Sequence, residues 1–327
     1  MFDSLTWWIV VFIVSLAVLV KASDYFTEAA EKLGIYFGIP AFIVGVTIVA
    51  FGTSLPELVS SIMAVFQGST EIVAGNVIGS NIANILLVLG IAAIIGKRFT
   101  IDHEIELVDL PILVLSSFLL LMMAWDGQIT VVEGGILLLG IVMYIFYAVS
   151  ASQEQGTHSE KKGKREVHRK GEFPLSALLI LFASLFFVFL GAKYTIDSVV
   201  KISDILNIGK DLIAVIAVAL GTSLPELLVT VSAARKGNAE MAVGNVLGSN
   251  VFNTFAVMGI PALLSPFSSS GSGLAIPESM VTFALPVMIL STFLYFIMTR
   301  DKQLTQWEGW GLLLFYGYFV LATFGLA

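Results

Sequence analysis

Long apolar segments separated by short polar ones run through the whole chain. Ten such segments can be counted, and each is close to the ~20 residues that a helix needs to cross a bilayer. They cover roughly residues 5–31, 39–66, 71–95, 107–125, 130–150, 174–199, 210–234, 240–264, 277–298 and 306–325. This pattern predicts an all-α polytopic membrane protein with ten transmembrane helices.

One hydrophilic segment, residues 151–173, interrupts the pattern near the middle of the chain. It mixes six basic residues with four glutamates and is too short to fold as a regulatory domain. We expect a solvated linker between a first five-helix unit, residues 1–150, and a second, residues 174–327. Because five is an odd number, the second unit would cross the membrane upside down relative to the first. The chain would then be an inverted-topology repeat.

Composition narrows the class of protein. Apolar residues make up 57% of the chain and charged residues only 13%, compared with about 25% charged in soluble proteins. There are no cysteines, so disulfides and thiolate metal sites are excluded. All three histidines lie in polar segments, so we expect no histidine metal site within the membrane. The chain begins MFDSLTWW, which is acidic where a signal peptide is basic, so we expect the first apolar segment to be retained.

The basic residues are distributed unevenly between the two sets of loops. Loops on one side of the predicted membrane hold thirteen of the 17 Lys and Arg residues, and loops on the other side hold two. The remaining two, Lys21 and Lys193, lie within predicted spans. The positive-inside rule therefore places both termini outside a plasma membrane and the linker in the cytoplasm.

A heptapeptide, GTSLPEL, occurs at Gly52–Leu58 and again at Gly221–Leu227. The first copy is followed by GNVIGSNIAN (Gly75–Asn84) and the second by GNVLGSNVFN (Gly244–Asn253), with an offset of 169 residues at every matched position. Each copy puts a glutamate, hydroxyls and carboxamides into segments predicted to lie in lipid. Packing explains repeated glycines but not a repeated buried glutamate. Duplicated polar groups at this depth are typical of ion and solute transporters.

The spacing within each copy suggests how the polar groups converge. Pro56 should break or kink its helix, with Gly52 permitting irregular backbone, so that carbonyls near Ala50 need new partners. Thr53 and Glu57 would share one side of a helical turn, with Ser54 beside them. A bound cation could supply the missing partner.

The third apolar segment adds two more groups, because Ser80 and Asn84 are four residues apart and share a helix face. Oxygen ligands without nitrogen or sulfur suit Ca²⁺, which takes about 6–8 of them, and also Na⁺. Glu57 and Glu226 facing each other would carry −2, which one Ca²⁺ or two Na⁺ would neutralise. Since an empty, doubly charged site should not reorient easily, obligatory exchange is expected.

The paired blocks resemble the α-repeats of the cation/Ca²⁺ exchanger superfamily, in its prokaryotic Na⁺/Ca²⁺ exchanger branch. The resemblance covers nearly the whole chain, including the number of spans and the position of the linker. It implies that Glu57 and Glu226 share a central Ca²⁺ with backbone carbonyls of Thr53 and Thr222. It also implies that spans one and six form a gate that slides over a core of the other eight.

The same resemblance implies sites on either side of the central ion. One Na⁺ would be held by Ala50 (through its carbonyl), Thr53, Ser54 and Ser80, and another by Ala219 (through its carbonyl), Thr222, Ser223 and Ser249. Asn84 and Asn253 would occupy the middle positions.

The chain departs from the family pattern at two places. Asn253 stands where the second repeat usually has an aspartate, which leaves two candidate carboxylates in place of three. Lys193 stands where the sixth span tends to have an acid, whereas the first half retains Asp24. We expect Lys193 and Asp24 to reach the interface or to pair locally.

The expected protein is therefore a secondary antiporter that exchanges Na⁺ for Ca²⁺ by alternating access, exports Ca²⁺ and is functional as a monomer. It would not be an enzyme and would need no cofactor and no nucleic acid. A proton-coupled or other divalent-cation exchanger on the same fold is the nearest alternative, although Gly75-Asn76 is not followed by the additional acid that the proton-coupled branch tends to carry. A cation channel and a membrane scaffold without transport are alternatives from other classes.

Overall fold

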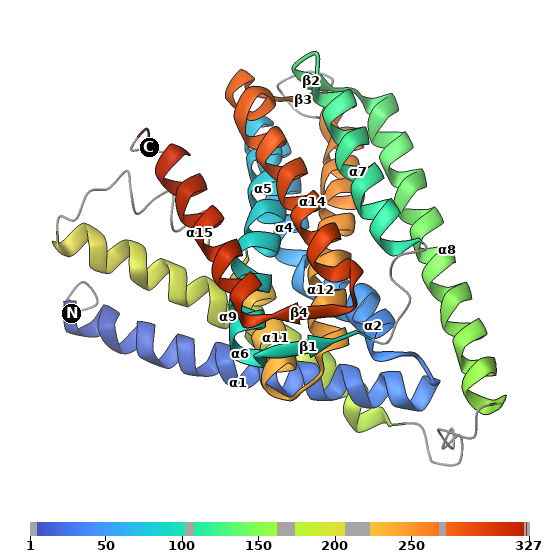
Figure 1. The fold of residues 1–327 in the computed structure, drawn as a ribbon. Helices are drawn as coiled ribbons and strands as arrows, with labels where there is room; N and C mark the ends of the chain where they lie inside the picture. Colours follow the sequence, from blue (N-terminus) through green and yellow to red (C-terminus); the bar gives the residue numbers. More distant parts are fainter. Residues whose placement is uncertain are drawn as a thin grey trace.

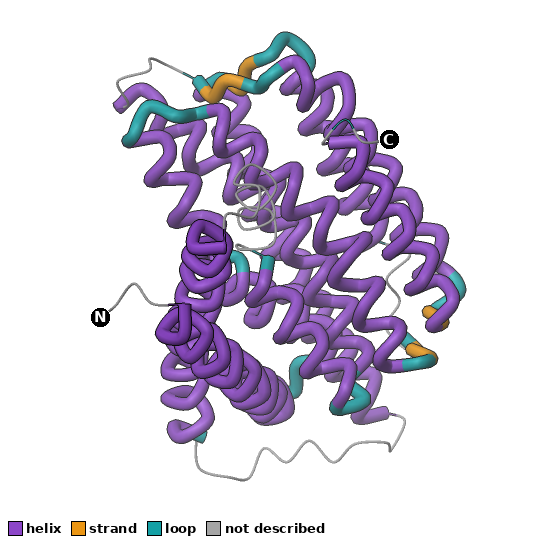
Figure 2. Tube along the Cα trace, turned by 90° about the vertical axis from the view of Figure 1, so that its left-hand side faces the viewer, coloured by secondary structure: helices purple, strands orange, loops and turns teal. Residues whose placement is uncertain are grey.

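The structure, a computed structural model, describes residues 5–101, 108–161, 174–206, 223–267, 273–323 and 325. The elements before the linker are α1 (Leu5–Phe37), α2 (Ala41–Val44), η1 (Gly45–Val49), α3 (Ala50–Thr53), α4 (Leu55–Phe66), α5 (Glu71–Ala83), η2 (Asn84–Leu89), α6 (Gly90–Gly96), β1 (Arg98–Thr100), α7 (Asp109–Ala124), β2 (Gln128–Ile129) and α8 (Val131–Lys161). Those after it are α9 (Leu175–Leu206), α11 (Leu224–Arg235), α12 (Ala239–Phe252), η3 (Asn253–Val257), α13 (Met258–Leu264), η4 (Ser265–Phe267), β3 (Leu274–Ala275), η5 (Met280–Ala284), α14 (Leu285–Arg300), β4 (Gln303–Thr305) and α15 (Gln306–Thr323). Nearly all described residues are helical, as Figures 1 and 2 show.

The helices follow the predicted apolar segments, which confirms the membrane class. Within the described ranges, six helical stretches are long and apolar enough to cross a membrane, and a bent pair, Ala41–Thr53 with Leu55–Phe66, makes a seventh. The count of ten stays a prediction, because the expected span 210–234 is described only from Ser223 onward and α7 has only 16 residues.

Helices α1 and α9 form an antiparallel pair that lies across one side of the upright bundle (Figure 1). Gly191 of α9 lets the two helices approach closely, because a Cβ there would lie 2.8 Å from Leu19 Cβ. Thr195 of α9 donates a hydrogen bond to Ser15 of α1 (2.9 Å). The two helices therefore pack mainly on each other, and the cluster of Leu19, Ala22, Val188 and Ala192 between them is separate from the main core. Both helices also contribute to the main core, through Phe26, Ala29, Ala30 and Leu33 of α1 and Ala177 and Leu181 of α9.

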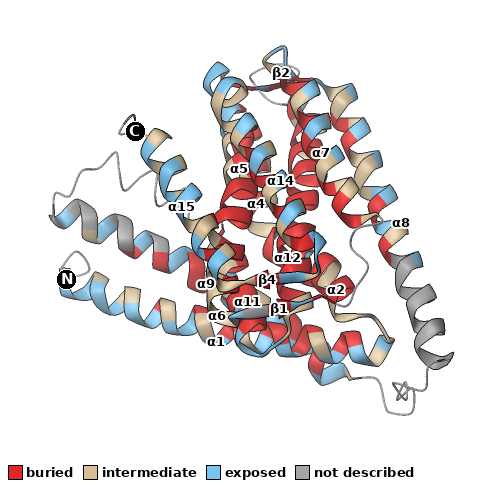
Figure 3. Ribbon diagram, in the orientation of Figure 1, coloured by how far each residue is buried: buried red, intermediate tan, exposed pale blue. Residues whose placement is uncertain are grey.

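The centre of the bundle is formed by α5–η2–α6 and by α12–η3–α13. In the apolar stretches of these two segments, 72% and 89% of the residues are buried, compared with 33% or less in the other four long stretches. Figure 3 shows this buried centre in red. Since both segments contain the second block of the repeated motif, the motif lies in the most enclosed part of the molecule.

The parts of the chain before and after the linker are interleaved. Strand β1 pairs with β4, and β2 pairs with β3, each antiparallel. Figure 1 shows these two ribbons at different ends of the upright helices. Gly90 packs on the Gly309 backbone and Gly259 on the Gly134 backbone, and in each case an added Cβ would lie 3.1 Å from the partner's carbonyl oxygen. Every one of these contacts joins a residue before the linker to a residue after it.

Candidate functional site

The helix that carries the first heptapeptide is broken, as predicted. The break lies at Ser54 (φ −88°, ψ 4°), between α3 and α4, which meet at an angle of 40°. Pro56 stands in the first turn of α4, where its missing N–H is tolerated, and it removes the bond to the carbonyl four residues earlier. Ser223 precedes α11 with nearly the same backbone angles (φ −88°, ψ 2°). Helices α4 and α11 therefore begin with the same backbone geometry in the two copies.

Gly52 has a different role from the one predicted. It lies within α3, in regular helix, and a Cβ at this position would lie 2.9 Å from the Phe26 ring of α1. The glycine therefore makes room for α1, and the irregular backbone is at Ser54.

Ten of the twelve predicted ligand residues lie in the described part of the chain, and all ten are at most 3% exposed. They are Ala50, Thr53, Ser54, Glu57, Ser80, Asn84, Ser223, Glu226, Ser249 and Asn253. The other two, Ala219 and Thr222, lie outside the described residues.

The two motif copies meet at their acidic groups. Ser54 donates a hydrogen bond to Oε1 of Glu226 (3.0 Å) across 172 residues of sequence. Oε2 of Glu226 and both carboxylate oxygens of Glu57 are buried and accept no hydrogen bond from the described residues. The centre of the bundle therefore contains two carboxylates with three unsatisfied oxygens.

Several other polar side-chain groups are also buried and have no hydrogen-bond partner among the described residues. They are the hydroxyls of Ser223 and Ser249, Oδ1 of Asn84 and both amide atoms of Asn253. An unpaired buried polar group costs roughly 1–3 kcal/mol, so a concentration of them indicates a place where a ligand binds. Among the described residues no three Asp, Glu, His or Cys gather in one place. A cation here would therefore be bound by two carboxylates together with neutral oxygens.

The helices around this centre widen at the two middle-position asparagines. Asn84 begins the π-helical turn η2, and Asn253 begins the π-helical turn η3. Single π-helical turns often mark functional sites, because they leave backbone groups with altered partners. The two π-helical turns could not be predicted from the sequence, because apolar periodicity does not distinguish π from α turns.

A second set of asparagines supports the broken helices and was not predicted. Asn76 donates to the Glu57 carbonyl (3.0 Å) and to the Ser61 hydroxyl (2.9 Å). Asn245 donates to the Thr230 hydroxyl (2.8 Å). The available signal was their duplication, because both asparagines and both hydroxyls recur at the same offset.

Close backbone contacts bring α12 against the first motif copy. A Cβ at Gly244 would lie 2.5 Å from the Phe42 carbonyl oxygen, and one at Gly45 would lie 2.5 Å from the Met241 carbonyl oxygen. Repeated glycines in the block are expected to allow close approach of helices, and this is confirmed for Gly244 of the second copy. It is wrong for Gly79 of the first copy, where an added Cβ would meet nothing within 4 Å among the described residues.

Helix α1 is tied to α11 by polar contacts near its C-terminal end. Ser232 donates to the Asp24 carboxylate (2.7 Å). Lys236 donates to the Asp24 carbonyl (2.6 Å) and forms an ion pair with Glu28 (3.1 Å). The expectation of local pairing is confirmed for Asp24. Lys193 of α9 is exposed, with its Nζ 6.0 Å from the Tyr194 ring centroid.

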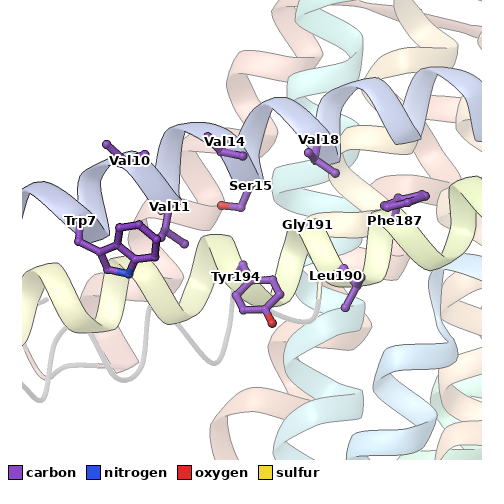
Figure 4. Close-up of a pocket in the computed structure, with 10 residues that line it drawn as sticks. All are labelled: Trp7, Val10, Val11, Val14, Ser15, Val18, Phe187, Leu190, Gly191 and Tyr194. Atoms are coloured by element: carbon purple, nitrogen blue, oxygen red, sulfur yellow. The ribbon is translucent and has the colours of Figure 1, made fainter. Parts of the chain in front are cut away.

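An open groove of about 410 Å³ lies between α1 and α9 (Figure 4). Its lining is apolar apart from Ser15 and Tyr194, and the Ser15 hydroxyl is occupied by Thr195. The groove therefore offers no set of oxygen ligands and is separate from the carboxylate centre.

Known proteins resemble this chain over most of its length. Residues 7–151 and 176–325 match the family model described as "Sodium/calcium exchanger protein". "Inner membrane protein YrbG" of Escherichia coli is 35% identical over 78% of this chain and 79% of its own. "Sodium/calcium exchanger MaX1" of Methanosarcina acetivorans is 32% identical over 96% of this chain and 97% of its own. A solved structure of the sodium-calcium exchanger NCX_Mj matches with a TM-score of 0.80 and 28% identity, over 96% of this chain and 97% of that one.

Proposed function

Because the chain belongs to the sodium/calcium exchanger family and exchanges Na⁺ for Ca²⁺ across a membrane, we propose that Glu57 and Glu226 bind the Ca²⁺ between them. The observation that carries this proposal is the meeting of the two motif copies through Ser54 and Glu226. Three carboxylate oxygens there accept no hydrogen bond from the described residues. One Ca²⁺ would neutralise the two carboxylates and supply the missing partner.

Two flanking Na⁺ sites complete the proposal. The ligands would be Ala50, Thr53, Ser54 and Ser80 for one ion, and Ala219, Thr222, Ser223 and Ser249 for the other. Burial of the described members and the unpartnered hydroxyls of Ser223 and Ser249 support this assignment. Asn84 and Asn253 would hold the middle positions as neutral ligands, because a carboxamide offers one oxygen and does not ionise.

The proposed architecture is a pair of inverted five-helix repeats, residues 1–150 and 174–327, joined by residues 151–173. The two ribbons at different ends of the bundle and the matched glycine contacts support it. The α1–α9 pair, which packs mainly on itself, would be the gate that slides over the rest. Since all the proposed ligands come from one chain, a monomer would suffice.

The proposed orientation has both termini outside the plasma membrane and the linker in the cytoplasm. Lys97 and Lys302 both lie at the β1–β4 ribbon, where the Ile101 N–H donates to the Lys302 carbonyl (2.9 Å) and the Gln306 N–H to the Lys97 carbonyl (3.1 Å). This gathering of basic residues at one end agrees with the positive-inside rule. An inward Na⁺ gradient would then drive Ca²⁺ out of the cell.

Ca²⁺ uptake into proteoliposomes tests the function. Vesicles loaded with Na⁺ would be compared with vesicles that carry only a pH gradient, with the voltage clamped by an ionophore. We expect uptake driven by Na⁺ and lost in Glu226→Gln. Uptake driven only by the pH gradient would indicate proton coupling, and a steady ohmic current would indicate a channel.

A further inference from the structure

Asn250 lies in the second copy of the GSN sequence, but it contacts a proposed ligand of the first copy. Asn84 donates a hydrogen bond from Nδ2 to Oδ1 of Asn250 (3.2 Å). Both side chains are at most 1% exposed. Oδ1 of Asn84 is buried and accepts no hydrogen bond from the described part of the chain.

This pairing decides which end of the Asn84 carboxamide faces the proposed cation. A carboxamide carries its oxygen and its NH₂ group on opposite sides of one planar group, and only the oxygen binds a cation. Because Asn250 accepts from the NH₂ group, the Asn84 oxygen is turned toward the remaining buried space. We propose that Asn250 is a positioning residue that orients Asn84 for cation binding, an inference that rests on the proposed function of this site.

The second half lacks the equivalent contact. Asn81 corresponds to Asn250 at the repeat offset and would be expected to orient Asn253. The NH₂ group of Asn81 instead donates to the Thr254 hydroxyl (2.9 Å) and to the Asn250 carbonyl (3.4 Å). Both Oδ1 and Nδ2 of Asn253 are without a partner among the described residues. The first half has Ile85, which has no hydroxyl, where the second half has Thr254.

Thr254 therefore holds the NH₂ end of the Asn81 carboxamide, while Oδ1 of Asn81, the atom that would orient Asn253, accepts no hydrogen bond from the described residues. The two middle-position ligands differ as a result: Asn84 is held with its oxygen free, whereas Asn253 can present either its oxygen or its NH₂ group. The sequence difference behind the asymmetry is Thr254 in place of Ile85, because the first half has an asparagine, Asn81, at the position of Asn250.

The test is a double-mutant cycle in the reconstituted full-length protein, measured as Na⁺-driven Ca²⁺ uptake. We expect Asn250→Ala to raise the half-saturating Ca²⁺ concentration about tenfold, the effect of losing roughly one buried hydrogen bond, with the maximal rate unchanged. In an Asn84→Ala background, Asn250→Ala should have no further effect, because its partner is already gone. Asn250→Asp keeps an acceptor and should stay within about threefold of wild type.

Asn81→Ala is the matched control, because Asn81 occupies the same position in the first copy and contacts no proposed ligand side chain in the described part of the chain. It should leave the half-saturating Ca²⁺ concentration unchanged. An equal rise in Asn81→Ala, or additive effects of Asn250→Ala and Asn84→Ala, would overturn the assignment.

Thr254→Ile keeps the inference testable if Asn250→Ala does not fold. It should free the Asn81 carboxamide to turn, so that its Oδ1 can accept from Asn253, and lower the half-saturating Ca²⁺ concentration about threefold. No change would show that Thr254 does not divert Asn81. A wild-type protein without Na⁺-driven uptake would refute the proposed function itself, whereas normal wild-type exchange with unaffected Asn250 variants would refute only the positioning role.

Discussion

The two copies of GTSLPEL have the same sequence but different hydrogen bonds. In the first copy, Ser54 donates to Glu226 of the other copy. The equivalent pair, the Ser223 hydroxyl of the second copy and the carboxylate oxygens of Glu57 in the first, has no partner among the described residues. An identical heptapeptide therefore does not give an identical half-site, although each copy offers the other the same serine and the same glutamate.

The helices outside the site show the same contrast between the two halves. Asp24 ties α1 to Ser232 and Lys236 of α11. The matching position of α9 holds Lys193, which is exposed and lies near Tyr194. Helix α1 of the first half is thus bonded to α11 of the second half through Asp24. Lys193 of α9 makes no equivalent contact among the described residues.

The largest expected effect is the loss of Ca²⁺ uptake on neutralising either glutamate, and it would show that the two halves contribute equally to Ca²⁺ binding. Glu57→Gln and Glu226→Gln should each reduce Na⁺-driven Ca²⁺ uptake by more than about a hundredfold, because one remaining carboxylate leaves a Ca²⁺ charge uncompensated in the membrane. Isotopic Ca²⁺ uptake into proteoliposomes measures this. Retention of exchange by one variant alone would show that only one carboxylate binds Ca²⁺.

The next effect is a difference in stability between variants of Ser54 and Ser223 in the ion-free protein. Ser54→Ala should lower the free energy of unfolding by about 1–2 kcal/mol, because it removes a hydrogen bond to a carboxylate. Ser223→Ala, the matched control, removes a hydroxyl without a described partner and should change it little. Thermal unfolding in detergent without Na⁺ or Ca²⁺ compares the two. Equal losses would mean that both serines contact a carboxylate in solution.

A smaller effect is expected at the contact between α1 and α11. Lys236→Met removes a partly exposed ion pair with Glu28, which is worth only ~0.2–1 kcal/mol. The chain has no cysteines, so Ser23→Cys would place a single reporter at a buried position of α1. We expect Lys236→Met to speed thiol labelling of this reporter about threefold.

Lys193→Met serves as the control for this experiment, and it should leave the labelling rate unchanged. Faster labelling in both variants would show that neither contact holds α1 specifically. Equal rates in Lys236→Met and wild type would show that the ion pair does not restrain α1.

The smallest effect concerns the residues that precede the ribbon strands. Lys302 has a left-handed backbone (φ 56°), whereas Gly127 takes the same kind of position before β2 (φ 82°). Lys302→Gly should raise the free energy of unfolding by about 0.5 kcal/mol, since relief of left-handed strain exceeds the entropic cost of glycine. Thermal unfolding detects this, and Gly127→Lys should shift it in the opposite direction. A fall in Lys302→Gly would mean that the lysine side chain itself stabilises the ribbon.

The sequence was enough to predict the membrane class, the broken helix at Pro56 and the burial of the polar groups. These depend on local properties: apolar length, a missing N–H and the cost of polar groups in lipid. The irregular backbone was predicted at Gly52 but lies at Ser54. The contact of Gly52 with the Phe26 ring of α1 cannot be seen from the local sequence.

The hydrogen bonds of Asn250 and Asn81 could not be predicted from one sequence. Asn250 contacts Asn84 only because α12 crosses the first motif copy, and this crossing depends on glycines that let backbones touch. The diversion of Asn81 by Thr254 depends in turn on a single difference between the halves. Such contacts follow from the packing of distant helices, which spacing along the chain does not determine.

The interleaving of the two halves has a consequence for biosynthesis. Gly90 and Gly134 leave the ribosome and enter the membrane long before their partners, Gly309 and Gly259, have been synthesised. The helices of the first half must therefore wait in lipid with their closest packing surfaces uncovered until the last helix inserts. Correct assembly is thus a property of the completed chain, and a chain cut in the linker would yield two fragments that depend on each other to fold.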